Sequence, residues 1–183
     1  MAKTQMDAVA LLKADHRKVE DLFAKFEATK STAKKQTLVQ QICTELCVHT
    51  MIEEEIFYPA CTGEIEEDVV QEAYVEHDGA KVLIAELVAS DVDEEFFDAK
   101  VKVLSELIKH HVQEEERRSE GMFAQARAAG LDLVDLGERM ATRKKELLAE
   151  VKENGLPTPE TRSYSGHELT QGKPMDEIAP AAQ

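Results

Sequence analysis

The chain has 183 residues, and its 37 acidic against 22 basic residues give a formal net charge of −15. This length suits one domain with a true hydrophobic core, while so negative a field disfavours nucleic acids and anionic membranes as partners. No apolar run approaches the roughly 18 residues that span a bilayer, and the first residues lack the apolar segment of a secretion signal. We therefore expect a globular protein of the cytoplasm.

Apolar residues recur every three or four positions from the start of the chain, a spacing typical of amphipathic helices. The first helix is predicted over residues 7–29 and the second over about 31–61, opening on a Ser or Thr cap. Polar residues replace aliphatic ones on both apolar faces: His16 on the first helix, and His49 and Glu53 on the second. Because His49 and Glu53 are four residues apart, they lie on one side of their helix.

A third helix is predicted over about residues 64–89, with His77 on its apolar face. The fourth is expected to follow a cap at Asp91 or Asp93. Its inward face comprises Val101, Leu104, Ile108, His111, Glu115, Arg118 and Met122. Arg118 is the one basic residue that we expect on the four apolar faces.

A fifth helix is predicted over about 132–153, and the Asn-Gly pair that follows it is a strong stop signal. The segment after that pair is polar and interrupted by Pro and Gly. We expect it to be extended or disordered in isolation, or laid over the helices. His167 lies in this tail without a partner at ligand spacing.

The predicted fold is therefore all-α. Residues 1–130 are expected to form an up-down-up-down four-helix bundle, and residues 131–155 an additional helix packed on the bundle or extending it. Residues 156–183 form the tail. In such a bundle the apolar faces of all four helices meet in one interior, so polar residues on those faces can converge.

The inward polar residues are repeated along the chain. His16 recurs as His77, 61 residues later, and the His49/Glu53 pair recurs 62 residues later. Six polar residues are thus expected in the interior: His16, His49, Glu53, His77, His111 and Glu115. Buried without partners, each would cost about 1–3 kcal/mol, and a charged carboxylate more. The arrangement therefore predicts bound metal cations.

The number and type of these ligands indicate which metal is expected. Four imidazoles and two carboxylates exceed the four ligands of a tetrahedral zinc ion. They suit two redox ions such as iron or manganese, each held by two histidines, with both glutamates shared between the ions. This division leaves coordination positions without a protein ligand, which a small molecule such as O2, NO or peroxide is expected to fill.

Four segments carry a family resemblance: Leu11–Val19, His49–Pro59, Glu76-His77 and His110–Glu116. In this order they resemble the hemerythrin family, specifically its bacterial hemerythrin-like branch of HHE cation-binding domains, over about residues 7–125. The resemblance implies an up-and-down four-helix bundle around a non-haem di-iron centre, bridged by two carboxylates and an oxo or hydroxo group. It also implies that the six inward residues are the iron ligands.

One position departs from the family pattern. Oxygen-carrying hemerythrins place a second histidine on the third helix, four residues from the first. Here the positions four residues from His77 are Ala73 and Lys81, so the site is one imidazole short. Tyr74 and Glu54 are candidates to fill the gap; alternatively, Tyr74 is a packed ring with its hydroxyl at the surface.

Another pair on the fourth helix has the same spacing as the predicted ligands. His110 and Glu114 are four residues apart, as are His111 and Glu115. The repeat along the chain favours the second pair, so His110 is expected to face solvent or a neighbouring helix.

Charged residues beside the motifs are expected to lie at the surface. Asp15 and Glu76, each one residue before an inward histidine, are interpreted as helix-surface charges. Four glutamates are expected on a solvated face or as acceptors that orient the imidazoles: Glu54, Glu55, Glu114 and Glu116. The three cysteines form no Cys-x-x-Cys pair and are expected to be reduced, buried thiols: Cys43, Cys47 and Cys61.

Three functions remain open at this point. The first is a di-iron protein that binds or senses O2, NO or peroxide, or holds iron, without turnover. The second is a di-iron oxidoreductase with catalase-like, peroxidase-like or NO-removing activity. The third is a metal store or a zinc-stabilised structural bundle. The sequence shows no nucleotide-binding loop, nucleophile or acid–base pair apart from the ligands, and no motif that identifies a redox partner.

Overall fold

The computed structural model describes residues 6–166, and every regular element in that range is a helix. The elements are α1 (Ala8–Ala28), α2 (Thr32–Ile52), the π-helical turn η1 (Glu53–Phe57), α3 (Tyr58–Cys61), α4 (Glu67–Ala89), α5 (Phe97–Glu116), α6 (Met122–Ala128) and α7 (Leu133–Asn154). The predicted all-α class is confirmed for this part of the chain. Among these helices, none is long and apolar enough to cross a membrane.

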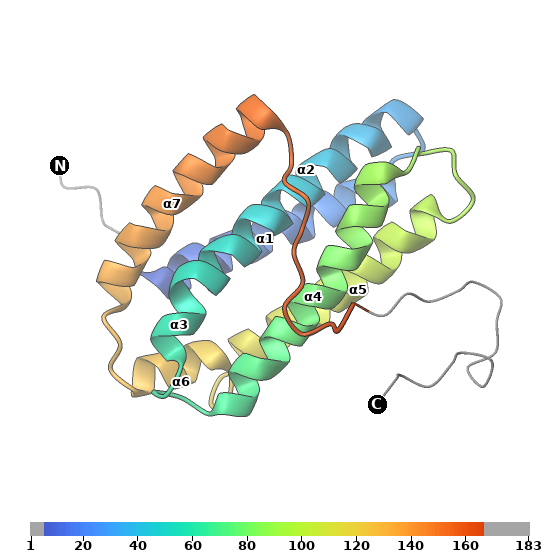
Figure 1. Ribbon diagram of the computed structural model, residues 1–183. Helices are drawn as coiled ribbons and strands as arrows, with labels where there is room; N and C mark the ends of the chain where they lie inside the picture. Colours follow the sequence, from blue (N-terminus) through green and yellow to red (C-terminus); the bar gives the residue numbers. More distant parts are fainter. Residues whose placement is uncertain (1–5, 167–183) are drawn as a thin grey trace, which may run out of the picture.

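Four long helices, α1, α2, α4 and α5, lie side by side (Figure 1). α1 packs along α2 and α4 packs along α5, while contacts of α2 with α4 and of α1 with α5 join the two pairs. α7 lies against α1 and α2, and the short α6 packs against α5 near one end of the helices. The four long helices therefore share one interior.

Two apolar clusters fill that interior. One includes Leu12 of α1 and Phe57 of η1, and the other includes Phe23 of α1 and Leu104 of α5. These four side chains are at most 3% exposed, and the burial of each contributes roughly 1.5–3 kcal/mol. His16 lies between Leu12 and Phe23 along α1. The polar side chains therefore meet at a level of the bundle that is bounded by one apolar cluster on each side.

Side-chain caps fix the starts of three helices. Asp7 accepts a hydrogen bond from the backbone N–H of Ala10 at 2.7 Å, and Ser31 and Asp132 cap α2 and α7 in the same way. α7 ends at Gly155, whose φ of 84° is accessible to glycine at little cost. As a result, α1 and α7 begin and end within a residue of the predicted positions.

Two other helix starts were predicted wrongly. α4 begins only at Glu67, because the chain turns after α3. α5 begins at Phe97, and neither Asp91 nor Asp93 caps it. The residues before α5 form a turn instead, in which the backbone N–H of Asp91 donates to the side chain of Glu94 at 3.0 Å.

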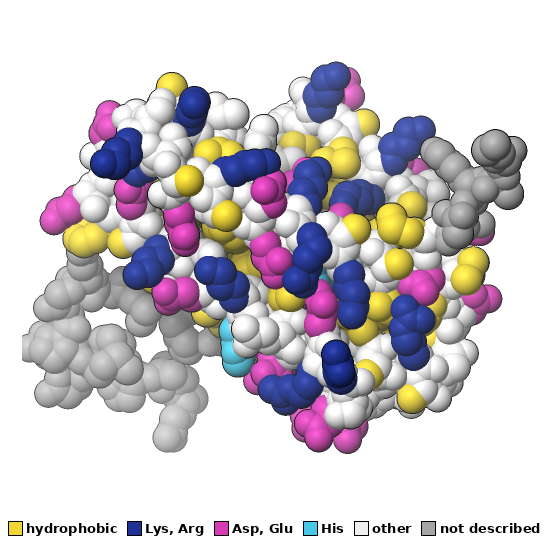
Figure 2. Space-filling view, turned by 180° about the vertical axis from the view of Figure 1, so that it is seen from behind, with side chains coloured by type: hydrophobic (Ala, Val, Ile, Leu, Met, Phe, Trp, Pro, Cys, Tyr) yellow, Lys and Arg dark blue, Asp and Glu magenta, His cyan; other side chains and the backbone are white. Residues whose placement is uncertain are grey.

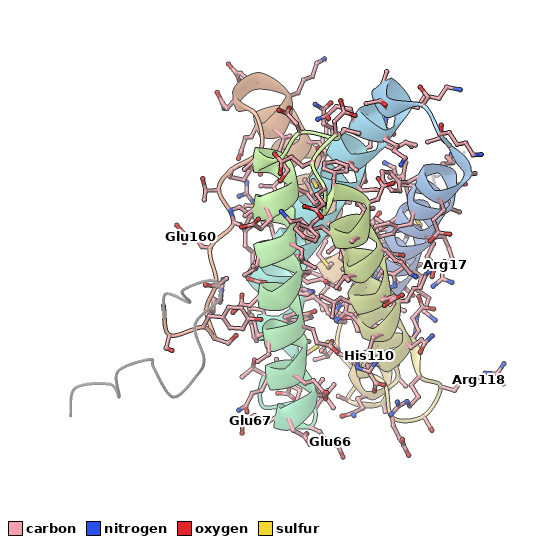
Figure 3. The ribbon with its side chains drawn as sticks, turned by 90° about the vertical axis from the view of Figure 1, so that its right-hand side faces the viewer. Arg17, Glu66, Glu67, His110, Arg118 and Glu160 are labelled. Carbon is pink, nitrogen blue, oxygen red and sulfur yellow. The ribbon has the colours of Figure 1, made fainter. Side chains whose placement is uncertain are left out.

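The predicted inward face of the fourth helix is also too long. α5 ends at Glu116, and Arg118 is exposed and points away from the helices (Figure 3). Met122 is fully buried but belongs to α6. The turn between the two helices requires Gly121, because a Cβ atom there would lie 2.6 Å from the backbone oxygen of Glu115.

A π-helical turn interrupts the helix that was predicted to continue past Glu53. Within η1 the N–H of Tyr58 donates to the carbonyl of Glu53, five residues back instead of four. In a continuous α-helix two residues five apart differ by about 140° around the axis. The wider turn reduces that angle, so Tyr58 stands above Glu53 on the inward side of the helix.

Residues 156–166, here called the strap, follow α7 without forming a helix and cross the face made by α2 and α4 (Figure 1). The strap is fixed by Asp78, a fully buried residue of α4. Asp78 accepts hydrogen bonds from the N–H of Arg162 at 2.8 Å, and from the N–H and the hydroxyl of Ser163 at 2.6 Å each. The rest of the predicted tail, with His167, lies outside the described residues.

Candidate metal centre

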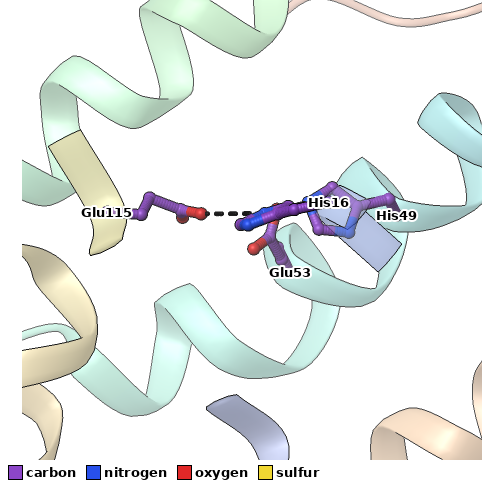
Figure 4. A group of neighbouring side chains, drawn as sticks. All are labelled: His16, His49, Glu53 and Glu115. Carbon is purple, nitrogen blue, oxygen red and sulfur yellow. Dashed lines mark hydrogen bonds and ion pairs between the residues drawn. The ribbon is translucent and has the colours of Figure 1, made fainter. Parts of the chain in front are cut away.

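The six inward polar residues predicted from the sequence meet in one buried layer. α1 contributes His16, α2 contributes His49 and η1 contributes Glu53; α4 contributes His77, and α5 contributes His111 and Glu115. None of the six is more than 5% exposed. Figure 4 shows four of them facing one another between their helices.

His16 and His49 form one half of the layer. Their Nε2 atoms are 3.2 Å apart. Nε2 of His49 lies 3.1 Å from Oε2 of Glu53, and Nε2 of His16 lies 3.4 Å from Oε2 of Glu115 (Figure 4). These four residues place one ligand atom each within 4.8 Å of all the others. Separations near 3 Å are those of neighbouring ligand atoms around an ion bound at about 2.1 Å.

His77 and His111 form the other half with nearly the same distances. Their Nε2 atoms are also 3.2 Å apart. Oε2 of Glu53 lies 3.4 Å from Nε2 of His77, and Oε2 of Glu115 lies 3.5 Å from Nε2 of His111. Each glutamate thus faces both histidine pairs, in the arrangement that two ions sharing both carboxylates need.

A carboxylate also stands behind each imidazole. The Nδ1 atoms face these oxygens: His16 to Glu116 at 2.8 Å, His49 to Asp15 at 3.7 Å, His77 to Glu54 at 3.0 Å and His111 to Glu76 at 2.8 Å. Three of the four are hydrogen bonds, whereas Asp15 is beyond hydrogen-bond length. Carboxylates in this position fix the orientation and tautomer of a ligand imidazole.

The prediction that Asp15 and Glu76 are surface charges was wrong. Asp15 is only 7% exposed, and Glu76 is largely covered. A residue next to an inward histidine points sideways on its helix, where a neighbouring helix can cover it. The repeat offered a signal, because Asp15 recurs as Glu76 and Glu54 as Glu116 at the same spacings as the histidines.

The orientation of His77 and His111 leaves a place for a cation. Because their Nδ1 atoms face carboxylates, the neutral rings carry their protons there and turn the Nε2 lone pairs toward each other. Two lone pairs 3.2 Å apart repel unless a proton or a metal ion lies between them. Buried oxygens in the same layer also lack a hydrogen-bond partner, namely Oε1 of Glu53 and Oε2 of Glu115. The donor set therefore fits metal ions.

The carboxylates of the layer also favour protonation of two of its imidazoles, those of His49 and His111. Burial alone would lower the pKa of His49, but Glu53 and Asp15 outweigh it and raise the pKa to about 10. For His111, burial again opposes protonation, while Glu115 and Glu76 raise the pKa. The pKa of Glu53 lies well below its usual value because His49 and His77 outweigh the effect of burial. A metal ion bound in the layer would therefore compete with protons for His49 and His111.

Tyr58 is a further residue of the layer that the sequence did not reveal. Its buried hydroxyl lies 3.1 Å from Nε2 of His77, 3.2 Å from Oε1 of Glu115 and 3.5 Å from Oε2 of Glu53. Burial first, and then the negative charges of Glu115 and Glu53, raise the pKa of Tyr58 well above its usual value. The phenol therefore keeps its proton and donates to the layer.

The two candidates for the missing ligand lie elsewhere. Tyr74 is only partly buried and packs edge-on against the ring of Tyr58, with the guanidinium carbon of Arg162 5.4 Å from its ring centre. Glu54 points to Nδ1 of His77, behind the imidazole, and pairs with the buried Lys81 at 2.7 Å. Lys81, not Arg118, is thus a buried basic residue next to the polar layer.

Other candidate residues stay apart from the layer. The side chain of His110 is 59% exposed and lies 3.3 Å from Glu76. The cysteines Cys43, Cys47 and Cys61 are buried and free. Burial raises the pKa of Cys43 and of Cys61 to about 12, so neither presents a thiolate at neutral pH.

Three comparisons relate this chain to known proteins. A family model described as "Hemerythrin HHE cation binding domain" matches residues 7–123. A DNA nickase of Nostoc sp. (strain PCC 7120) is 30% identical over 114 residues, which make up 62% of this chain but only 32% of that protein. The crystal structure of a hemerythrin HHE cation-binding domain-containing protein from Mycobacterium kansasii has 22% identity and a TM-score of 0.67, covering 82% of this chain and 95% of that one.

Proposed function

The chain belongs to the hemerythrin HHE cation-binding domain family, and from that premise we propose that its buried layer holds two iron ions and binds O2, NO or peroxide. One observation carries the proposal: two pairs of imidazoles face the same two carboxylates, and in each pair the Nε2 atoms are 3.2 Å apart. Iron bound there would supply redox chemistry and coordination positions open to a small molecule.

Each residue of the layer has a distinct role in this proposal. His16 and His49 would hold one ion, and His77 and His111 would hold the other. Glu53 and Glu115 would bind both ions, as the resemblance to the hemerythrin family implies. The carboxylates behind the imidazoles hold the rings in place, and the apolar clusters on either side exclude bulk water.

We assign the scaffold as an up-down-up-down bundle of α1, α2, α4 and α5 that carries α7 as an additional helix. Support comes from the contacts of α1 with α2, of α4 with α5 and between the two pairs. The fold match to the M. kansasii protein supports the same scaffold. We place the protein in the cytoplasm, where reduced cysteines such as the three buried thiols are usual.

A second candidate function is a di-iron oxidoreductase that consumes peroxide or removes NO. One observation favours it: the Tyr58 hydroxyl is a protonated donor inside the layer and is not one of the six proposed ligands. A proton donor beside a bound peroxide or NO is what turnover requires. Release of O2 after addition of peroxide to the iron-loaded protein would identify catalase-like turnover, and tight binding without consumption would identify a binding protein.

Binding of nucleic acid is not part of the proposal. The net charge of −15 disfavours it, although Figure 2 shows Lys and Arg side chains spread among Asp and Glu over one face. The relative named DNA nickase matches this chain over 32% of its own length, so its activity is not transferred.

Metal analysis of protein produced with iron tests the main proposal. We expect close to two irons per chain, with near-ultraviolet absorption from charge transfer to iron. His49→Ala and Glu115→Ala should lose most of this iron, whereas Glu106→Gln on the exposed side of α5 should keep it. One zinc per chain without those absorption bands, or full iron loading of both ligand variants, would reject the di-iron centre.

A further inference from the structure

A pocket of about 310 Å³ lies between α4, α5 and the turn after α5. Six glutamates line it: Glu66, Glu72, Glu76, Glu114, Glu115 and Glu120. Arg117 is the one Lys or Arg in its lining, and two of its lining residues, His111 and Glu115, belong to the buried layer. This acidic pocket therefore joins the protein surface to two residues of the buried layer.

Three residues beside the acidic pocket form a second group of potential metal ligands. Glu72, Glu76 and His110 each place one oxygen or nitrogen within 4.8 Å of the others. Figure 3 shows His110 on α5 on the same face as Glu66 at the start of α4. Glu72 and His110 are exposed, so a cation can reach this group directly from solvent.

Glu76 connects the exposed group with the buried layer. One of its oxygens lies 3.3 Å from Nε2 of His110, and the other accepts from Nδ1 of His111 at 2.8 Å. The two histidines are neighbours on α5 but point to different environments, one to solvent and one inward. A cation held by the exposed group is thus separated from the layer by a single carboxylate and a single imidazole.

A second, independent observation points inward from the acidic pocket. Glu115 is 2% exposed, it contributes to the pocket wall, and its Oε2 has no hydrogen-bond partner. This oxygen lies between Nε2 of His16 at 3.4 Å and Nε2 of His111 at 3.5 Å. A buried carboxylate oxygen without a hydrogen bond attracts a cation strongly, because little water is there to screen it. The glutamates around the pocket add a negative field that draws cations toward this oxygen.

We propose that Glu72, Glu76 and His110 form an outer divalent-cation site, from which a cation passes through the acidic pocket into the buried layer. This inference rests on the proposed function, since it needs a layer that accepts metal. Two carboxylates and one imidazole are ligands that suit Fe²⁺ and Co²⁺. Because Glu72 and His110 are exposed, a cation held there is able to leave again.

Uptake of Co²⁺ by the full-length, metal-free protein tests the outer site, since Co²⁺ stays divalent in air and its visible absorption reports His and carboxylate ligation. The test variant is the double change Glu72→Gln and His110→Ala. Glu76 is left intact because it also holds His111. The control is Glu138→Gln on α7, which removes one negative charge far from the acidic pocket.

In stopped-flow mixing at low Co²⁺ concentration, we expect the double variant to load at least 10-fold more slowly than the wild type and to reach the same final spectrum. Glu138→Gln should load within twofold of the wild type. Equal loading rates in all three proteins, or equal slowing in both variants, would overturn the outer site.

Binding at the outer site itself is measured on protein whose layer is already filled with Co²⁺. Titration with Mn²⁺, followed by the loss of its free electron-paramagnetic-resonance signal, should show one weak additional site in the wild type and in Glu138→Gln. Its presence in the double variant would reject our assignment. If the wild type takes up no Co²⁺ in its layer, the proposed function fails. If the wild type and the double variant take up Co²⁺ at the same rate, only the outer site is rejected.

Discussion

Nδ1 of His16 and a carboxylate oxygen of Glu116, a hundred positions later in the chain, are joined by a hydrogen bond of 2.8 Å. That bond holds the pKa of Glu116 at about 2, where Arg17 and Lys13 also favour its charged form. Glu54 accepts from His77 in the same manner. In both cases a carboxylate from one helix pair, α1 with α2 or α4 with α5, orients an imidazole of the other pair.

Glu116→Gln tests this orienting role. The amide keeps the shape of the side chain but lacks the charge that fixes the imidazole, so we expect the affinity of the protein for iron or cobalt to fall about 10- to 100-fold. Competition with a chelator of known affinity measures the change. Glu106→Gln, on the exposed side of the same helix, should leave the affinity unaltered. Equal affinities for all three proteins would show that the hydrogen bond is incidental.

Tyr58→Phe separates the phenol from the six proposed ligands. The variant should retain wild-type iron content, since no imidazole or carboxylate is changed. Loss of one hydrogen bond donated to a bound small molecule, worth about 1–1.5 kcal/mol, should weaken NO binding by the reduced protein about 5- to 10-fold. Spectrophotometric titration with NO gives the affinity.

Tyr74→Phe is the matched control for this prediction, because Tyr74 packs against Tyr58 without a polar contact to the layer. It should bind NO as the wild type does. A Tyr58→Phe variant that loses its iron would instead make the phenol oxygen a ligand.

The stability of the metal-free protein should depend on pH in a defined direction. The pKa of folded His49 is about 10, above the ordinary 6.5, so its contribution is complete below pH 6.5 and lost as pH rises through 10. The pKa of Glu53 lies well below 4.5, so its contribution is present above pH 4.5 and lost on further acidification. With respect to these groups, stability is greatest between these limits.

Loading with Co²⁺ should change that dependence, because the metal displaces the histidine protons. The stabilisation by metal should therefore grow as pH rises from 6.5 toward 10. Urea unfolding of both forms across this range measures the difference. If the metal-free protein is equally stable throughout, the charged state of His49 is misassigned.

Asp78→Ala should release the strap. Three hydrogen bonds to a charged, buried carboxylate are lost together, so we expect the free energy of unfolding to fall by about 2–4 kcal/mol. The freed strap should also be cut by trypsin after Arg162 well before the helices are. Glu86→Ala, an exposed position on the same helix, should change neither measurement. Slow cleavage of the Asp78 variant would mean that other contacts hold the strap.

Much of this architecture follows from the period of the apolar residues. Because 3.6 residues make a turn, the spacing of His16 from Leu12, or of His49 from Glu53, fixes which side of a helix each occupies. The apolar residues around them must be buried, so polar residues on the same side are carried into the interior. The convergence of the six residues was predictable for that reason.

Features that depend on a local break or on a neighbouring helix escaped the same reasoning. If the α-helical period of α2 continued through Glu53–Phe57, as predicted, Tyr58 would point away from the layer. The π-helical turn η1 brings it inward instead. Asp15 and Glu76 occupy the flank of a helix, where burial depends on what packs alongside. Lys81 is buried only because Glu54 and Asp78 lie within its reach.

The exchange of carboxylates between the helix pairs bears on how such a chain could arise. Glu54, in the first half of the chain, contacts His77 in the second half, and Glu116, in the second half, contacts His16 in the first. Neither half therefore supplies all the carboxylates that orient its own imidazoles. Two identical hairpins associated about a twofold axis would satisfy every one of these bonds, and joining them end to end would preserve the arrangement. Fusion also frees the copies to diverge: the counterpart of Tyr58, 62 residues on, is Glu120. An ancestral symmetric dimer would offer two equivalent cation positions, whereas this chain, with a phenol beside only one histidine pair, distinguishes them.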